Sequence, residues 1–125
     1  MKRRFVRAGD ELRGDATVIV RGGELDRELL RDDALRNHAI YGTYGISVFA
    51  VRDITLDELA QRAPLVRFAR LTLIQVGVLR TAGVRLDPTG RDRLHYDVCF
   101  DELESGIDRL LGCDHELWAN PYHEP

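Results

Sequence analysis

Residues 39–50 read Ala-Ile-Tyr-Gly-Thr-Tyr-Gly-Ile-Ser-Val-Phe-Ala, a segment in which two glycines and two tyrosines lead directly into an apolar run. Glycine allows the backbone to turn sharply, and tyrosine rings and hydroxyls can stack and form hydrogen bonds. The pattern predicts a site-lining loop over residues 41–45 and a β-strand over residues 46–51. The place of this strand in the sheet decides whether the loop belongs to a site, because the loop alone supplies only part of one.

The composition is that of one globular domain spanning residues 1–125. Hydrophobic residues make up 44% and charged residues 31% of the chain, and a chain of this length buries a core without disulfide support. No apolar run approaches the roughly 20 residues that span a bilayer, and the basic start is not followed by the apolar segment of a signal peptide. We therefore expect a cytoplasmic protein without membrane association, in which Cys99 and Cys113 are buried thiols.

Charge is distributed unevenly, although the formal net charge is only −3. Residues 62–93 contain seven arginines against two aspartates, whereas residues 94–125 contain eight carboxylates against one arginine. Two arrangements remain open: separate basic and acidic faces, or a mosaic in which the two sets form ion pairs. The basic segment allows nucleic acid as a partner, but the negative net charge does not favour it.

Two elements are predicted before the Tyr-Gly segment. Residues 17–21 form a compact, β-branched strand that ends in Arg21 and is stopped by two glycines. Asp26 is placed to cap a helix that runs to about residue 36. The inner side of this helix is predicted to carry Leu29, Leu30, Ala34 and Leu35.

The segment after the second strand is less regular. Thr-Leu-Asp-Glu at residues 55–58 is a capping box that opens a short helix, and Pro64 ends it. Residues 66–83 fit both a helix and a strand, and their β-branched residues favour a strand over residues 67–76. A helix there would remove the strand that should follow the Tyr-Gly segment.

The last third carries clearer signals. Residues 84–86 and 94–100 alternate like the arms of a hairpin, and a helix opens at Asp101 and stops at Gly112. The tail contains Trp118 and Tyr122, which we expect to pack on the body. Together these elements predict an α+β domain with a mixed or split sheet of about five or six strands and three main helices.

Two of these segments resemble motifs of the ADP-ribosyltransferase superfamily. In that family a first strand ends in Arg or His followed by Gly, which is similar to Val-Ile-Val-Arg-Gly-Gly at residues 18–23. A later loop and strand of the form Tyr-Gly-x-Gly-Ile-Tyr-Phe-Ala is similar to residues 41–50. The helix and apolar strand that follow this motif resemble residues 56–63 and 68–76, so the likeness covers half of the chain.

The resemblance implies a small enzyme that uses NAD as its substrate. Breaking the nicotinamide–ribose bond develops oxocarbenium character on the ribose, which a nearby carboxylate stabilises. By this likeness the catalytic candidates are Arg21, Tyr44, Ser47 and Glu124, with Glu102 and Glu104 as alternative carboxylates. The NAD-binding candidates are Arg21, Gly22, Gly23, Tyr41 and Tyr44, and no metal is expected. The site requires the strand of residues 46–51 to lie beside the strand of residues 17–21.

Two other classes of function remain open. A metal-independent ribonuclease toxin would use His95, Tyr122 and His123 for proton transfer and Arg85 to hold the scissile phosphate. A non-catalytic module would bind a protein partner through its acidic or basic segment. If the chain is an enzyme, its small size is compatible with the toxin of a prokaryotic toxin–antitoxin pair, whose partner would be an antitoxin.

Overall fold

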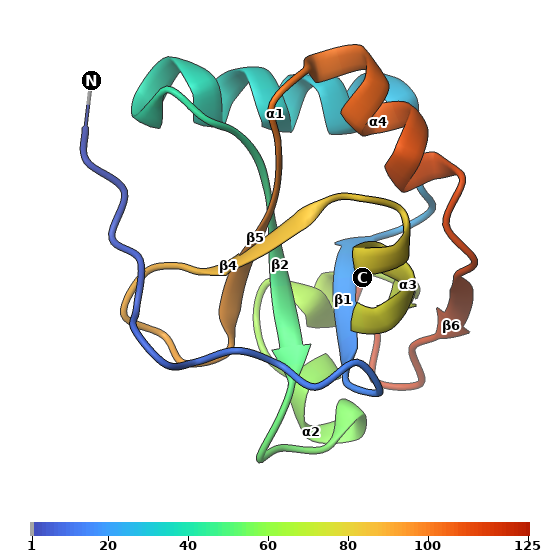
Figure 1. Cartoon of the computed structure of the whole chain (residues 1–125). Coiled ribbons are helices and arrows are strands. Elements are labelled where there is room, and N and C mark those ends of the chain that lie inside the picture. The colour runs from blue at the N-terminus through green and yellow to red at the C-terminus, as the bar shows by residue number, and fades with distance from the viewer. Residues whose placement is uncertain (1) are drawn as a thin grey trace.

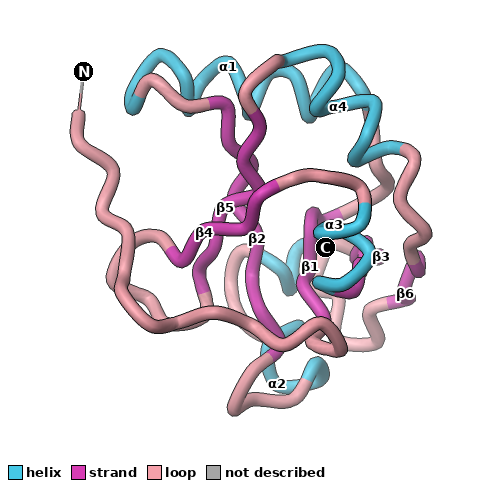
Figure 2. Tube along the Cα trace, viewed as in Figure 1, coloured by secondary structure: helices cyan, strands magenta, loops and turns pink. Residues whose placement is uncertain are grey.

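Six strands form one continuous sheet in the order β4-β5-β2-β1-β3-β6, and every pairing is antiparallel (Figure 1 and Figure 2). This computed structural model describes residues 2–125. The strands are β1 (Thr17–Gly22), β2 (Tyr44–Val51), β3 (Arg70–Gln75), β4 (Arg85–Pro88), β5 (His95–Phe100) and β6 (Glu116–Ala119). The helices are α1 (Arg27–Tyr41), α2 (Leu56–Ala60), α3 (Val76–Thr81) and α4 (Leu103–Leu111), with a 3-10 turn η1 (Leu65–Arg67) before β3. The expected α+β class, single domain and strand number are confirmed, and the sheet is antiparallel throughout.

Strand β1 lies between β2 and β3, and its alternating side chains divide the core in two. Val18 and Val20 pack on one face of the sheet with apolar side chains of α1, α3 and α4. Ile19 packs on the other face with side chains of α2 and η1. We call these the α1 face and the α2 face. Alternation assigns each side chain of the central strands to one face or the other.

Helix α1 runs five residues past its predicted end because its stop signal is Gly42. Asp26 caps the helix as predicted, by accepting a hydrogen bond from the backbone amide three residues ahead at 3.0 Å. Gly42 adopts φ 78°, a left-handed conformation that favours glycine, and its amide donates to the carbonyl oxygen of His38. Tyr41 is therefore the last helical residue, and Tyr44 already belongs to β2. The predicted loop is only the short connection between them.

The buried side of α1 is narrower than the sequence suggests. Leu30 and Ala34 are buried, but Leu29 and Leu35 are 45% and 44% exposed, so their predicted place in the core was wrong. The outer side carries arginines that face α4, and the two helices lie side by side in Figure 1. Nε of Arg31, for example, lies 2.8 Å from a carboxylate oxygen on α4.

Residues 66–83 contain both of the elements that the sequence allowed. Residues 70–75 form β3, which confirms the favoured strand, and α3 begins directly after it at Val76. The ambiguity arose because β3 is buried on both faces from Leu71 to Ile74, so that polar and apolar residues do not alternate. The predicted hairpin of β4 and β5 and the helix ending before Gly112 are also confirmed.

Acidic residues of the C-terminal segment pair mainly with the N-terminal half of the chain. On α4, Glu104 contacts Arg27 and Arg31, and Asp108 contacts Arg27. Within residues 2–125, Asp101 is the only one of these acids that contacts an arginine of residues 62–93, with Nη1 of Arg85 4.0 Å from its Oδ1. The mosaic, in which the two sets pair with each other, is therefore not what the structure shows. Across residues 2–125, no helix has both the length and the apolar character needed to cross a membrane.

Candidate functional site

Strands β1 and β2 are neighbours, which meets the condition that the sequence set for a site. The register pairs Ile19 with Phe49, so continuing it by two residues brings Arg21 opposite Ser47. These four side chains line one pocket of about 350 Å³ on the α2 face. Its other walls come from Val20 and Gly22 of β1, from Asp33 on α1, and from Pro64, Leu65 and Phe68. We call it the β1–β2 pocket.

Arg21 lies beside a break in the regular sheet. The register between β1 and β3 shifts between Ile19 and Arg21, as at a β-bulge, and bulges redirect side chains next to functional sites. Nη1 of Arg21 lies 3.8 Å from Oδ2 of Asp33, and Nε is buried with no hydrogen-bond partner. The side chain is 19% exposed. The guanidinium thus holds a buried donor that no residue of the described chain satisfies.

Gly22 allows an aromatic ring to form one wall of the pocket. A Cβ atom built on Gly22 would lie 2.2 Å from ring carbons of Phe68, so the ring packs directly on the glycine backbone. Gly23 does not line the pocket. Its amide donates to the carbonyl oxygen of Arg70, and its carbonyl oxygen accepts from the Thr72 hydroxyl at 2.6 Å. Of the two predicted glycines, one borders the pocket and the other holds the turn.

Ser47 connects the pocket with a polar network on β5. Its hydroxyl donates to Oδ1 of Asp97 at 3.3 Å, and Asp97 is only 4% exposed. Arg4 reaches the same carboxylate at 3.5 Å and also lies 2.7 Å from both Asp87 and the sulfur of Cys99. Burial raises the pKa of Cys99 to about 11, and the neighbouring guanidinium only partly opposes this. The thiol stays neutral and is a weak nucleophile.

Asp33 is a pocket residue that sequence reasoning missed, and it supplies the one carboxylate among the described lining residues. It also contacts Arg36, one turn along α1, at 3.2 Å. Asn37 lies one turn from Asp33, directly after Arg36, and donates to the carbonyl oxygen of Gly45, so this side of α1 faces the start of β2. The spacing of Asp33 and Asn37 was the available signal, because residues four apart lie on one side of a helix. It indicates a site only once the helix is known to lie beside β2.

The structure does not bring the two tyrosines to the pocket. Tyr44 points to the α1 face, where its ring stacks on His38 with centroids 4.3 Å apart and lies 6.4 Å from the ring centroid of Phe100. Ser47 is three residues along the strand and therefore points to the opposite face. Tyr41 ends α1 and is not among the lining residues.

The predicted glutamates also lie outside the pocket lining. Glu124 is exposed in the tail, and its backbone amide donates to the carbonyl oxygen of Val66 at 2.9 Å. Glu102 occupies the N-cap position of α4 without a capping hydrogen bond from its side chain, and Glu104 pairs with Arg31. Among the described lining residues, the carboxylate of the pocket is that of Asp33 and not that of a predicted glutamate.

The four ribonuclease candidates form hydrogen bonds with other residues and not with one another. Nδ1 of His95 contacts the Thr89 hydroxyl at 3.0 Å, and Arg85 contacts Asp87 at 3.1 Å. The Tyr122 hydroxyl donates to Asp57 at 3.2 Å, and the backbone amide of His123 donates to Asn120. None of these contacts joins two of the candidates. Partial burial and the contact with Asp57 raise the pKa of Tyr122, which keeps its phenol protonated.

Asn120, a second residue that sequence reasoning missed, fixes the wall formed by residues 64–68. Its side-chain amide nitrogen lies 3.2–3.3 Å from the carbonyl oxygens of Ala60, Leu65 and Phe68, and the residue is buried. Its side-chain oxygen accepts a hydrogen bond from the amide of Tyr122. The tail therefore positions one wall of the β1–β2 pocket.

The pocket thus combines an arginine with an unpaired donor, a serine hydroxyl, a carboxylate and two aromatic rings. Among residues 2–125, no group of three or more His, Cys, Asp and Glu side chains is arranged to hold a metal ion. Comparisons with protein-family models, with curated proteins and with solved structures find no match to the chain.

Proposed function

We propose that the protein binds NAD in the β1–β2 pocket and cleaves its nicotinamide–ribose bond, as an ADP-ribosyltransferase-like enzyme. The observation that carries the proposal is that Arg21 and Ser47 line one pocket, in which the Nε atom of Arg21 is buried without a partner. A buried donor without an acceptor favours a ligand that brings one, such as a phosphate oxygen. The pocket volume of about 350 Å³ lies within the range of small-molecule sites.

Each wall of the pocket suits one part of the dinucleotide. The Arg21 guanidinium would hold the diphosphate, since its planar fork matches phosphate oxygens. The rings of Phe49 and Phe68 would flank the planar nicotinamide. The Ser47 hydroxyl, held by Asp97, would contact a ribose hydroxyl. These contacts would orient the nicotinamide–ribose bond inside the pocket.

The bond between ribose C1′ and the nicotinamide nitrogen breaks with its electron pair on nitrogen, so nicotinamide leaves as a neutral molecule. The ribose is left with oxocarbenium character, and Asp33 is the lining carboxylate that can stabilise this charge. An acceptor nucleophile then bonds to C1′ and releases its proton to solvent. With water as the acceptor, the products are ADP-ribose and a proton.

The test measures NAD binding by calorimetry and nicotinamide release by chromatography with the purified protein. We expect the wild-type protein to bind and cleave NAD, and Arg21→Ala to lose both. Arg67→Ala is the matched control, because Arg67 is an exposed arginine next to the pocket wall and forms no ion pair within residues 2–125. Absence of binding and cleavage in the wild type, or unchanged cleavage in Arg21→Ala, would overturn the proposal.

The proposal includes the role of a toxin whose partner is an antitoxin. It is supported by the small size of the chain and by the harm that uncontrolled NAD cleavage or ADP-ribosyl transfer does to a cell. Induced expression in a bacterium should then arrest growth, and Arg21→Ala should restore it at equal protein level. Equal growth arrest by the two proteins would exclude NAD chemistry as its cause.

A further inference from the structure

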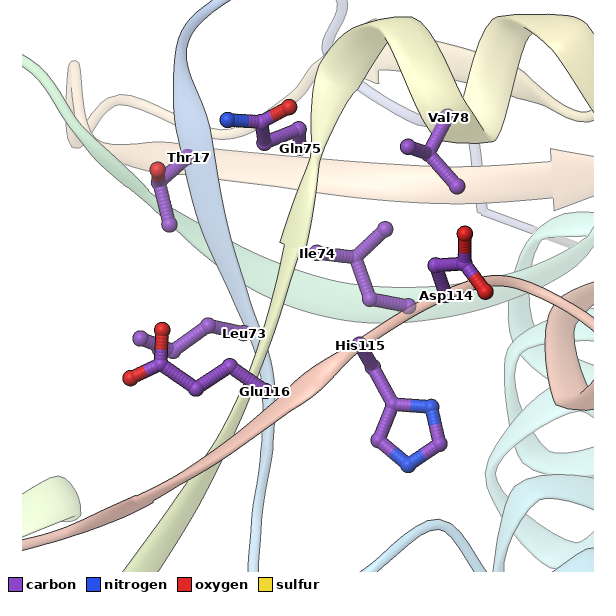
Figure 3. Close-up of a pocket in the computed structure, with 8 residues that line it drawn as sticks. All are labelled: Thr17, Leu73, Ile74, Gln75, Val78, Asp114, His115 and Glu116. Carbon is purple, nitrogen blue, oxygen red and sulfur yellow. The ribbon is translucent and has the colours of Figure 1, made fainter.

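A groove lies at the β6 edge of the sheet, beyond the point where β6 no longer pairs with β3. The last pair between these strands joins Leu73 to Glu116, and the chain before Glu116 turns away toward α4. Ile74 and Gln75 of β3 therefore border an open space instead of a strand. Figure 3 shows this space between β3, α3 and residues 114–116.

Two cavities of about 350 and 590 Å³ make up this groove. They share Gln75, Val78 and Asp114, so they are continuous. We call them together the α3–β6 groove. It has no lining residue in common with the β1–β2 pocket, so a ligand in one leaves the other free.

The walls of the groove include several apolar side chains. Ile74 and Cys113 are buried, and Val78 and Ala82 are partly exposed. Burial raises the pKa of Cys113, so its thiol is neutral and behaves as a small apolar group. This surface would contact apolar side chains of a ligand.

The polar side chains of the groove are mainly acidic. Asp114 and Glu116 are exposed, and within the described chain neither carboxylate forms an ion pair or a side-chain hydrogen bond. Although the chain has 18 lysines and arginines, none lines either cavity. The ring of His115 points away from the other labelled side chains in Figure 3, and its Nδ1 atom contacts the carbonyl oxygen of Cys113. The two carboxylates therefore give the groove an unbalanced negative charge.

We propose that the α3–β6 groove binds a segment of a partner protein that carries lysine or arginine between apolar residues. The cationic side chains would pair with Asp114 and Glu116, and the apolar side chains would cover Val78 and Ala82. The continuous shape fits an extended segment better than a single ion. Pairing between opposite charges at an exposed rim weakens with salt, so binding should fall as ionic strength rises.

The experiment uses the whole protein labelled with nitrogen-15 and, as probe, the acetylated heptapeptide Gly-Leu-Lys-Val-Lys-Leu-Gly. We expect the amide signals of residues 74–82 and 112–116 to shift, with a Kd below about 1 mM at low salt. A peptide with glutamate in place of both lysines should leave these signals unchanged. No shift with the basic peptide, or shifts confined to other residues, would overturn the proposal.

A pair of double variants separates the groove from general attraction to an acidic protein. Asp114→Asn with Glu116→Gln should raise the Kd about tenfold, because it removes both rim charges. Glu28→Gln with Asp32→Asn changes two exposed acids of α1 and lowers the negative charge equally, so its Kd should stay near that of the wild type. Equal Kd values for the two double variants would contradict binding in the groove.

Discussion

Arg21 and Asp33 form a loose ion pair in the β1–β2 pocket, with Nη1 and Oδ2 3.8 Å apart, while Nε of the same arginine is buried without a partner. Arg4, on the same face of the sheet, differs, since it lies 2.7 Å from Asp87 and 3.5 Å from Asp97. Protein groups satisfy Arg4, whereas Arg21 keeps one buried donor without a partner among residues 2–125. This difference leads to opposite expectations for stability.

Arg21→Met should separate stability from binding. The substitution removes an unsatisfied buried donor, so the free energy of unfolding should stay equal or rise by up to about 1 kcal/mol. NAD affinity should fall roughly tenfold to a hundredfold, as expected for a lost charge-assisted hydrogen bond. Urea unfolding and calorimetry measure the two quantities. Arg4→Met should instead cost about 2 kcal/mol or more, because it leaves the buried Asp97 without its cation and Asp87 with Arg85 alone. A similar loss in both variants would show that Arg21 is a structural residue.

Asp33→Asn should reduce the rate of cleavage more than binding. The amide keeps the size of the side chain but cannot stabilise a developing cation, so kcat for nicotinamide release should fall about tenfold or more. The Kd for NAD should change little. Asp32→Asn is the control, because Asp32 is the exposed neighbour on α1 and does not line the pocket. If the two variants cleave NAD equally fast, Asp33 has no catalytic role.

Part of this site was predictable from the sequence. The strand that ends in Arg21 and the strand that carries Ser47 were both recognised from β-branched runs and glycine stops. The sequence gives the pairing of these two strands only as a condition for the site, because local patterns do not say which strands are neighbours. The family resemblance assigns Tyr44 to the site, and the sequence pattern places it in a loop. It is the first residue of β2, where alternation turns it to the opposite face from Ser47.

The pocket residues that the sequence did not predict reach the site through contacts with residues far away in the sequence. Asp33 reaches the pocket because α1 lies beside β2, and Asn120 reaches residues 60–68 from the tail. Neither contact leaves a local motif. The wrong prediction that Leu29 and Leu35 are buried has the same cause. The width of the buried side of α1 depends on the elements packed against it and not on the periodicity of its own sequence.

Gly22→Ala and Gly106→Ala should have different effects although they create the same clash. An added Cβ would lie 2.2 Å from ring carbons of Phe68 in the first case and of Phe100 in the second. Phe68 is 38% exposed and its ring can move outward, so Gly22→Ala should cost about 1 kcal/mol of stability yet weaken NAD binding. Phe100 is buried, so Gly106→Ala should cost about 2–3 kcal/mol. Thermal unfolding and NAD titration test both, and unchanged NAD affinity in Gly22→Ala would exclude Phe68 from the site.

Asn120→Ala should destabilise the protein and loosen the pocket wall. The substitution removes the donor shared by three carbonyl oxygens and leaves buried acceptors unpaired, at a cost of about 2–3 kcal/mol. Asn37→Ala removes a single hydrogen bond to Gly45 and should cost about 1 kcal/mol. Amide hydrogen exchange should quicken at residues 64–68 in Asn120→Ala and not in Asn37→Ala. Equal protection of this wall in both variants would contradict the positioning role of Asn120.

Stability should fall in acid through carboxylates that arginines hold ionised. The hydrogen bond from Arg31 lowers the pKa of Glu104 below its ordinary value of 4.5, and Arg7 likewise lowers the pKa of Asp10. A carboxylate whose pKa is lower in the folded state stabilises the fold at pH values above its unfolded pKa, and this contribution is lost as pH falls through the folded pKa. The free energy of unfolding, measured in urea, should therefore decrease as pH is lowered from about 5 to 3. Glu104→Gln should flatten this dependence because it removes one of the titrating groups. Glu28→Gln should not, because Glu28 is exposed and forms no ion pair within residues 2–125. Parallel curves for the two variants would show that the Arg31–Glu104 pair does not couple folding to protonation.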